Sequence, residues 1–321
     1  MNIDLIRSLL PDTSFKSFDD IRYSRVLGAN RHINMIGEIL IDIINDSKTE
    51  NELKDRFIKV ASYYKETRGN QSRAIYNAIN EMTYGFNDID FNDLDKAKQK
   101  IINKIKEYDK NAKKNTAKII EYSNNLIENM KAIMLFDYSS TLNELILKSN
   151  SSIDIYIAES RALDGGRPFV EAALKAGHRT FFFPDSTMLE VLKKCDAAFI
   201  GVESYYPDGT VFNTIGSDIL AILCKSLNKP LFALTPMIKV DERNAYGFTR
   251  LSPMPYDYSI KIATNWEKEL VEKIDFNGVK LVEVEPELIT AIVTELGVIP
   301  PRAMYSIAMN YAKYLKGEPY V

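Results

Sequence analysis

The chain has 321 residues, of which 45% are hydrophobic and 26% charged, a composition typical of soluble globular proteins. Its length suggests about two domains, and its net charge of -3 gives no overall drive toward nucleic acid or an anionic membrane. We therefore expect neither partner. The sequence lacks a secretory signal pattern and any apolar run near the ~20 residues that span a bilayer, so we expect a cytoplasmic protein.

Residues 20–130 carry a helical pattern, with apolar residues spaced three and four apart. The stretch "ENELKDRFIKVASYYKET" is one example of this spacing. From Asp90 onward the sequence is long, charged and amphipathic, which predicts two helices or a single long one. We therefore expect an all-helical N-terminal domain over residues 1–130 that includes a long linking helix.

After residue 131 the pattern changes to short runs rich in β-branched and aromatic residues, separated by helical segments. The runs are "AIMLFDY", "IDIYIAES", "RTFFFPD", "AAFIGVES" and "PLFALTP". Strands that are apolar nearly throughout and alternate with helices are typical of a parallel sheet covered on both faces. The sequence therefore predicts an α/β fold over residues 131–321, with a Rossmann-like, doubly wound parallel sheet.

Polar residues gather where these predicted strands end. In open α/β sheets, ligands bind outside the carboxyl ends of the strands, so these residues outline a candidate pocket. About half of them are good helix N-caps, whereas Arg161, Glu203 and Lys239 are poor ones. The strand-end residues are Asp137, Ser139, Glu159, Ser160, Arg161, Asp185, Glu203 and Lys239.

Two stretches favour an anionic ligand. In "ESRALDGGRP", Arg161 can form paired hydrogen bonds with a phosphate, and Gly166 belongs to a glycine pair that permits close backbone approach. The stretch "NTIGSD", from Asn213 through Gly216, opens a helix whose free N–H groups favour an anion. Together they predict a phosphorylated ligand.

Several stretches resemble one known family, namely "ESR…GG", "GVES…DGTVFNTIG", "NKPLFAL" and "VEPELITAIVTELGVIPPRA". This family joins the alpha, beta and delta subunits of translation initiation factor 2B with isomerases of methylthioribose phosphate and ribose bisphosphate. In the N-terminal half, "LGANRHI" and "TRGNQSRAIYNAI" are similar to isomerase segments. The resemblance implies phosphate contacts at Gly28, Ala29, Arg31 and Arg68.

The sequence also departs from the isomerases. The resemblance implies a catalytic Cys after the first strand and a catalytic Asp at the end of the fourth, but Asp137 and Glu203 stand at these positions. Thr214 replaces a lysine expected to bind phosphate. The stretches "DYSS" and "GVES" look more like the alpha subunit, which is regarded as a ligand-binding, regulatory member.

These observations leave three functional hypotheses. The chain is an initiation factor 2B alpha-like regulatory protein that binds a phosphorylated sugar or nucleoside monophosphate, or an aldose–ketose isomerase of the ribose bisphosphate type. In the isomerase, Asp137 and Glu203 would serve as acid and base. The third hypothesis is a structural subunit with a vestigial pocket.

The ligand and assembly expectations complete this interpretation. We expect no cofactor and no metal site, since two isolated histidines do not make one. Family members pair through the α/β domain, which implies a homodimer or a higher homo-oligomer. The candidate ligand-binding residues are Gly28, Ala29, Arg31, Arg68, Ser139, Glu159, Ser160, Arg161, Gly166, Asn213, Gly216 and Lys239.

Overall fold

The structure, a computed structural model, describes residues 3–23, 25–26, 28–248 and 255–318. The chain divides into two compact units, one of Met1–Lys114 with Asn310–Val321 and one of Asn115–Met309. Each unit has a hydrophobic core of its own. The division falls within helix α7 (Leu94–Ile127), whose two halves contribute isoleucines to different cores.

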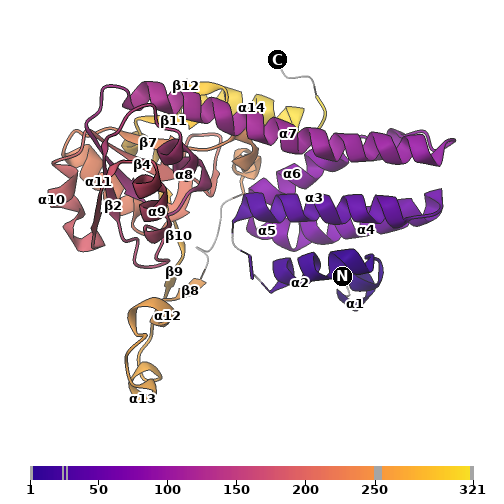
Figure 1. The fold of residues 1–321 in the computed structure, drawn as a ribbon, viewed down its shortest axis with the longest axis horizontal. Coiled ribbons are helices and arrows are strands. Elements are labelled where there is room, and N and C mark those ends of the chain that lie inside the picture. Colours follow the sequence, from indigo (N-terminus) through magenta and orange to yellow (C-terminus); the bar gives the residue numbers. More distant parts are fainter. Residues whose placement is uncertain (1–2, 24, 27, 249–254, 319–321) are drawn as a thin grey trace. The chain divides into compact units, whose positions relative to one another are not determined.

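The first unit is helical (Figure 1), and its helices are amphipathic segments. Its α4 shows how the sequence sets a helix start: Thr49 at the N-cap accepts a hydrogen bond from the Glu52 backbone N–H at 3.3 Å. The Glu52 carboxylate reaches back to the Lys48 N–H at 2.7 Å. Besides the first half of α7, the helices are α1 (Ile3–Ser8), α2 (Phe15–Arg22), α3 (Ala29–Asp46), α4 (Glu50–Glu66), α5 (Arg68–Gln71) and α6 (Arg73–Thr83).

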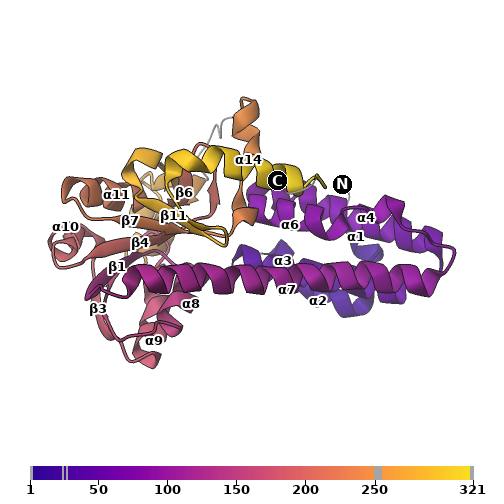
Figure 2. The same cartoon turned by 90° about the horizontal axis from the view of Figure 1, so that it is seen from above.

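The long charged stretch predicted from the sequence forms one continuous helix, α7 (Figure 2). Lysines and acidic residues dominate its exposed positions, as the amphipathic pattern predicts. Although α7 has ample length, no helix among the described residues combines length with the low polarity that crossing a bilayer requires.

The second unit is built on a seven-stranded sheet in the order β12-β11-β7-β4-β1-β2-β3. Neighbouring strands are parallel, except that β12 runs antiparallel to β11. This arrangement confirms the predicted fold class. The strands are β1 (Ala132–Phe136), β2 (Asp154–Ala158), β3 (Arg179–Phe183), β4 (Ala197–Gly201), β7 (Leu231–Leu234), β11 (Ala291–Thr294) and β12 (Gly297–Ile299).

Helices cover both faces of this sheet. On one face, α7 beyond residue 115 packs with α8 and α9 against alternate strand residues such as Ile133 and Leu135. On the other face, the start of α11 lies against the ring of Phe136, the last residue of β1. The helices of this unit are α8 (Ser140–Leu147), α9 (Arg167–Lys175), α10 (Met188–Leu192), α11 (Ser217–Ser226), α12 (Ser259–Ile262), α13 (Lys268–Val271) and the first part of α14 (Met304–Tyr314).

Two smaller antiparallel sheets were not predicted from the sequence. One has the order β10-β6-β5, and its register places Leu281 opposite Thr214. The other pairs β8 with β9 at the base of a projection that carries α12 and α13 (Figure 1). The strands are β5 (Ser204–Tyr205), β6 (Val211–Thr214), β8 (Pro255–Asp257), β9 (Asn277–Val279) and β10 (Leu281–Val284).

Candidate functional site

The strand order reverses between β1 and β4. From β1 the chain continues through β2 to β3 on one side, and from β4 it continues through β7 to β11 on the other. In such sheets the crevice outside the carboxyl ends at the reversal is the usual ligand site. Asp137 directly follows β1, and Glu203 lies two residues beyond β4. The topology therefore places both predicted acid–base candidates at strand ends that flank the reversal.

Asp137 is a buried carboxylate with both oxygens hydrogen-bonded. Oδ1 accepts from Ser160 Oγ at 3.0 Å and Oδ2 accepts from Thr214 Oγ1 at 2.6 Å. Burial raises the pKa of Asp137, while the two hydroxyl donors act in the opposite direction. The carboxylate thus joins the ends of β1, β2 and β6, and both of its oxygens have partners within the protein.

The predicted glycine pair packs closely around this carboxylate. A Cβ atom on Gly165 would lie 1.9 Å from Asp137 Oδ1, and one on Gly166 would lie 2.0 Å from the carbonyl oxygen of Ala158. Neither space admits a side chain. The close backbone approach predicted from the glycine pair is therefore made by Gly165 to Asp137 and by Gly166 to β2.

The segment after β2 is held by Asp185. Its carboxylate accepts from the backbone N–H groups of Ser160 at 2.9 Å and Arg161 at 2.8 Å. The Arg161 guanidinium, 48% exposed, donates to Asp164 Oδ1 at 3.4 Å and to the Lys261 carbonyl at 2.7 Å. Two groups of the protein therefore accept hydrogen bonds from the guanidinium that the sequence suggested for a phosphate.

Glu159 and Ser139 both form hydrogen bonds with backbone groups at this edge of the sheet. The Glu159 N–H donates to the Phe183 carbonyl at 2.9 Å, and its side chain is half-buried. Ser139 occupies the N-cap of α8, where its Oγ accepts from the Leu142 N–H at 3.4 Å. This is the capping role that the residue type predicts.

Glu203 and Lys239 both lie near the end of β4. The half-buried Lys239, in the turn after β7, donates from Nζ to the carbonyl oxygen of Val202 at 2.6 Å. Burial lowers the pKa of Lys239, and the negative charge of Glu203 opposes that change. A carboxylate and an amine are therefore both present on the β4 side of the reversal.

The stretch from Asn213 to Gly216 ends β6 and opens α11. Asn213 Nδ2 donates to Ser217 Oγ at 3.0 Å, so the amide is used within the turn. Gly216 has a φ of 100°, and its N–H donates to Asp218 Oδ1 at 3.1 Å. A Cβ atom on Gly216 would lie 2.6 Å from the Phe136 ring, so the helix start needs glycine for both reasons.

Sequence reasoning missed two contributors. Thr214 stands where a lysine was expected, and its buried hydroxyl holds Asp137. Lys280 is half-buried opposite the same turn, where its carbonyl accepts from the Ile215 N–H at 3.0 Å, and its charge lowers the pKa of Asp137. The β-branched residues of "KLVEV" are the sequence signal that could have indicated β10, the strand that directly follows Lys280.

Of the predicted phosphate residues of the helical unit, Arg68 contacts the buried His32. Gly28 precedes α3, and Arg68 begins α5. His32 Nδ1 lies 3.0 Å from Arg68 Nη2, and its Nε2 lies 2.6 Å from the Val26 carbonyl. A guanidinium only donates, so Nδ1 accepts and Nε2 carries the proton. Ala29 begins α3 and Arg31 is exposed in its first turn.

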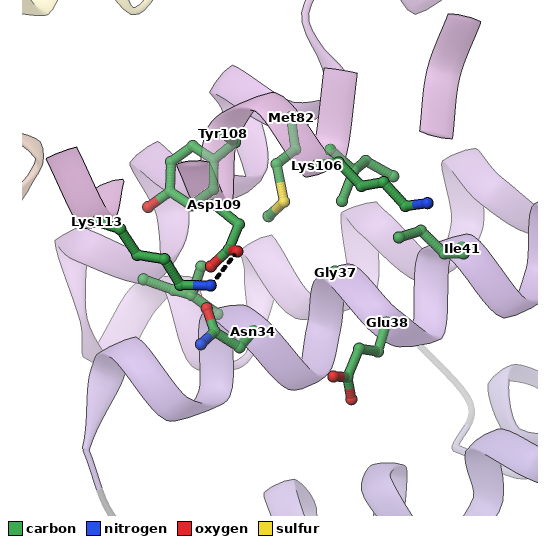
Figure 3. Close-up of a pocket in the computed structure, with 11 residues that line it drawn as sticks. Asn34, Gly37, Glu38, Ile41, Met82, Lys106, Tyr108, Asp109 and Lys113 are labelled. Carbon is green, nitrogen blue, oxygen red and sulfur yellow. Dashed lines mark hydrogen bonds and ion pairs between the residues drawn. The ribbon is translucent and has the colours of Figure 1, made fainter. Parts of the chain in front are cut away.

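The helical unit also contains a cavity of 220 Å³ that none of the predicted site residues lines. Its walls come from α3, α6 and the first half of α7 (Figure 3). The apolar part includes Ile33, Ile41, Met82 and Ile105, and an ion pair of 2.6 Å between Lys113 and Asp109 lies at its rim.

The two cysteines do not reach the sheet edge. Cys195 lies before the start of β4, Cys224 lies in α11, and both are buried. Burial raises the pKa of each thiol to about 12, so both are protonated near neutral pH. Over residues 3–23, 25–26, 28–248 and 255–318, no cluster of three or more His, Cys, Asp or Glu residues is arranged to hold a metal ion.

Comparison with known proteins adds the family context. Residues 25–301 match the family model described as the initiation factor 2 subunit family. Translation initiation factor eIF2B subunit alpha of Caenorhabditis elegans is 25% identical over 176 residues, which cover 54% of this chain and 55% of that protein. The match to that relative therefore spans about half its length.

Two archaeal proteins match over nearly their full length. Ribose 1,5-bisphosphate isomerase of Archaeoglobus fulgidus is 23% identical over 306 residues, which cover 92% of each chain. The crystal structure of 5-methylthioribose 1-phosphate isomerase from Pyrococcus horikoshii has a TM-score of 0.75 at 18% identity, and the match covers 95% of this chain and 92% of that one. This likeness confirms the fold.

Proposed function

Because the chain belongs to the initiation factor 2 subunit family, we propose that it is a cytoplasmic, alpha-subunit-like regulatory protein. Its ligand is a phosphorylated sugar or nucleoside monophosphate bound at the carboxyl edge of the parallel sheet. The observation that carries this proposal is the state of Asp137, whose two oxygens already accept from Ser160 and Thr214. A carboxylate held in this way suits a binding site better than a site that must exchange protons with its ligand.

Glu203 is the proposed partner of the ligand hydroxyls, and Lys239, which donates to the carbonyl of the preceding residue Val202, is a further proposed contact. The start of α11, from Asn213 to Gly216, is the proposed phosphate side of the pocket, because the helix N-terminus favours an anion. The remaining contacts come from strand-end position in the α/β unit and from family resemblance in the helical unit. They are Gly28, Ala29, Arg31, Arg68, Ser139, Glu159, Ser160, Arg161 and Gly166.

An aldose–ketose isomerase of the ribose bisphosphate type is the second candidate. The raised pKa of buried Asp137 favours it, because a carboxyl group that keeps its proton could serve as the acid while Glu203 serves as the base. The similarity to the Archaeoglobus enzyme over nearly the whole chain supports the same alternative. Turnover then requires Asp137 to exchange an internal hydrogen bond for one to the ligand.

Family members form oligomers, and we propose a homodimer or a higher homo-oligomer here. Ile219 and Ile222 on α11 support this, because they are 51% and 57% exposed although both are large and apolar. A structural subunit with a vestigial pocket, the third hypothesis, would assemble in the same way and bind no phosphosugar.

The test is phosphorus NMR of ribose 1,5-bisphosphate, ribose 5-phosphate and AMP, each with and without the protein. We expect line broadening of at least one ligand without new resonances. Glu203→Gln should weaken that binding about tenfold, the scale of one lost hydrogen bond to a charged group. Glu171→Gln, an exposed carboxylate on α9, is the matched control and should bind as the wild type does.

New resonances that disappear in Asp137→Asn would instead establish the isomerase. If no phosphorylated ligand broadens at millimolar concentration, the binding proposal is wrong and the structural-subunit hypothesis stands.

A further inference from the structure

The cavity of the helical unit has an apolar floor between α3, α6 and α7 (Figure 3). The side chains of Ile33, Met82 and Ile105 form this floor, and each is at most 4% exposed. Gly37 on α3 also lines the cavity. A Cβ atom built on it would lie 3.3 Å from Ile105 Cγ2 and 3.6 Å from Met82 Sδ, so any side chain at this position would narrow the space. The cavity therefore depends on a residue without a side chain.

The volume of the cavity limits the size of its occupant. An apolar cavity of about 150 Å³ is enough for a benzene molecule, and the cavity here has 220 Å³. It is smaller than the ~300 Å³ at which sites for drug-sized ligands begin. The space therefore suits a branched aliphatic, thioether or aromatic group together with a few polar atoms, and it is too small for a nucleotide.

The cavity is also lined by opposite charges that have no partner. Lys113 and Asp109 pair with each other at 2.6 Å. Lys106 on α7 and Glu38 on α3 are exposed, and neither side chain forms an ion pair or hydrogen bond with another described residue. An ammonium and a carboxylate beside one apolar floor are complementary to a ligand that carries both charges.

The same charges disfavour the phosphorylated ligand proposed for the sheet edge. Glu38 and Asp109 contribute two carboxylates to the lining, and both would repel a phosphate dianion. Lys113 is already paired with Asp109, which leaves one unpaired ammonium for an anionic group. The cavity therefore suits a zwitterion with one negative and one positive group.

We propose that this cavity binds a free amino acid with an apolar side chain. The side chain lies on the floor, where the flexible thioether of Met82 adapts to branched, thioether or aromatic shapes. The α-carboxylate of the ligand pairs with Lys106, and its α-ammonium pairs with Glu38. This inference is independent of the proposed function, because both the residues and the ligand class differ from those at the sheet edge.

The experiment is saturation-transfer difference NMR of the full chain with L-leucine, L-methionine or L-phenylalanine. We expect a signal from at least one of them, with a Kd of about 1 mM for so small a ligand. Two analogues of leucine test the charges, since isocaproate lacks the ammonium and isoamylamine lacks the carboxylate. Each should bind about threefold more weakly than leucine, the scale of one exposed ion pair.

Four variants locate the site. Ile41→Phe enlarges a partly buried side chain in the cavity wall and should weaken binding about tenfold or more. Lys106→Gln should weaken leucine and isocaproate about threefold but not isoamylamine, and Glu38→Gln should weaken leucine and isoamylamine but not isocaproate. Lys110→Gln, an exposed position of α7 that does not line the cavity, is the matched control and should bind as the wild type does.

The glutamine variants change exposed residues, so they test the site even if Ile41→Phe fails to fold. The inference is wrong if none of the three amino acids gives a signal, or if leucine binding is unchanged in both Lys106→Gln and Glu38→Gln. It is also wrong if isocaproate or isoamylamine binds as tightly as leucine, because the cavity would then recognise only an apolar group. Phosphorus NMR tests the sheet edge with other ligands, so neither outcome decides the proposed function.

Discussion

Asp137→Ala is expected to lower the free energy of unfolding of the α/β unit by about 2–4 kcal/mol. The substitution removes the acceptor of two hydroxyl groups, on Ser160 and Thr214, that are buried at 1% and 3% exposure. Asp137 also has a φ of 58°, which aspartate tolerates better than alanine. Urea unfolding followed by far-UV circular dichroism measures the loss.

Asp137→Asn is the matched variant, because it keeps an acceptor oxygen and the tolerance of a left-handed backbone. We expect it to cost less than half as much as alanine at neutral pH. Equal losses for the two variants would show that the hydrogen bonds to Ser160 and Thr214 contribute little.

The difference in stability between the wild type and Asp137→Asn is expected to depend on pH. The pKa of Asp137 is raised above its ordinary value of 3.8, so between 3.8 and the folded pKa the native state binds more protons than the unfolded state. The stability contributed by the protonated group is present below 3.8 and is lost as pH rises through that window. The asparagine variant lacks this group, so its stability relative to wild type should improve as pH rises there.

The main sheet could be predicted because its signal is local. Each of the five predicted strands is an apolar run bounded by polar residues. Burial on both faces requires such runs in β1, β4 and β7, whose residues are all buried. The pairing of β6 with β10 had no local signal, since Thr214 and its partner Leu281 are far apart in the sequence. Antiparallel pairing over such a distance depends on tertiary packing, which short-range patterns do not encode.

The same distinction applies to the site. Sequence position placed Asp137 and Glu203 at strand ends, because the strands themselves were recognisable. The partner of each side chain was not recognisable: the Arg161 guanidinium meets the carbonyl of Lys261, and Asp137 meets Thr214. These contacts join segments that are remote in the sequence, so only residue type and position at a strand end were available to assign Arg161 to a ligand.

Gly165→Ala is expected to destabilise the α/β unit by about 3 kcal/mol and to weaken phosphosugar binding about tenfold or more. The added Cβ would lie 1.9 Å from Asp137 Oδ1 and 3.0 Å from the backbone nitrogen of Tyr138. Neither neighbour can yield easily, because Asp137 is held by two hydroxyl groups and the other atom belongs to the backbone. The end of β1 must therefore move, and with it the edge at which the ligand binds.

Gly177→Ala, in the turn before β3, is the control for Gly165→Ala, and both are measured by urea unfolding and phosphorus NMR. Gly177 has a φ of 77° but no atom within 4 Å of a Cβ built on it. Its substitution should cost about 1–2 kcal/mol through the backbone alone and leave ligand binding unchanged. If Gly165→Ala behaves no worse than this control, Asp137 has room to move, and the case for a fixed carboxylate that binds without turnover gives way to the isomerase.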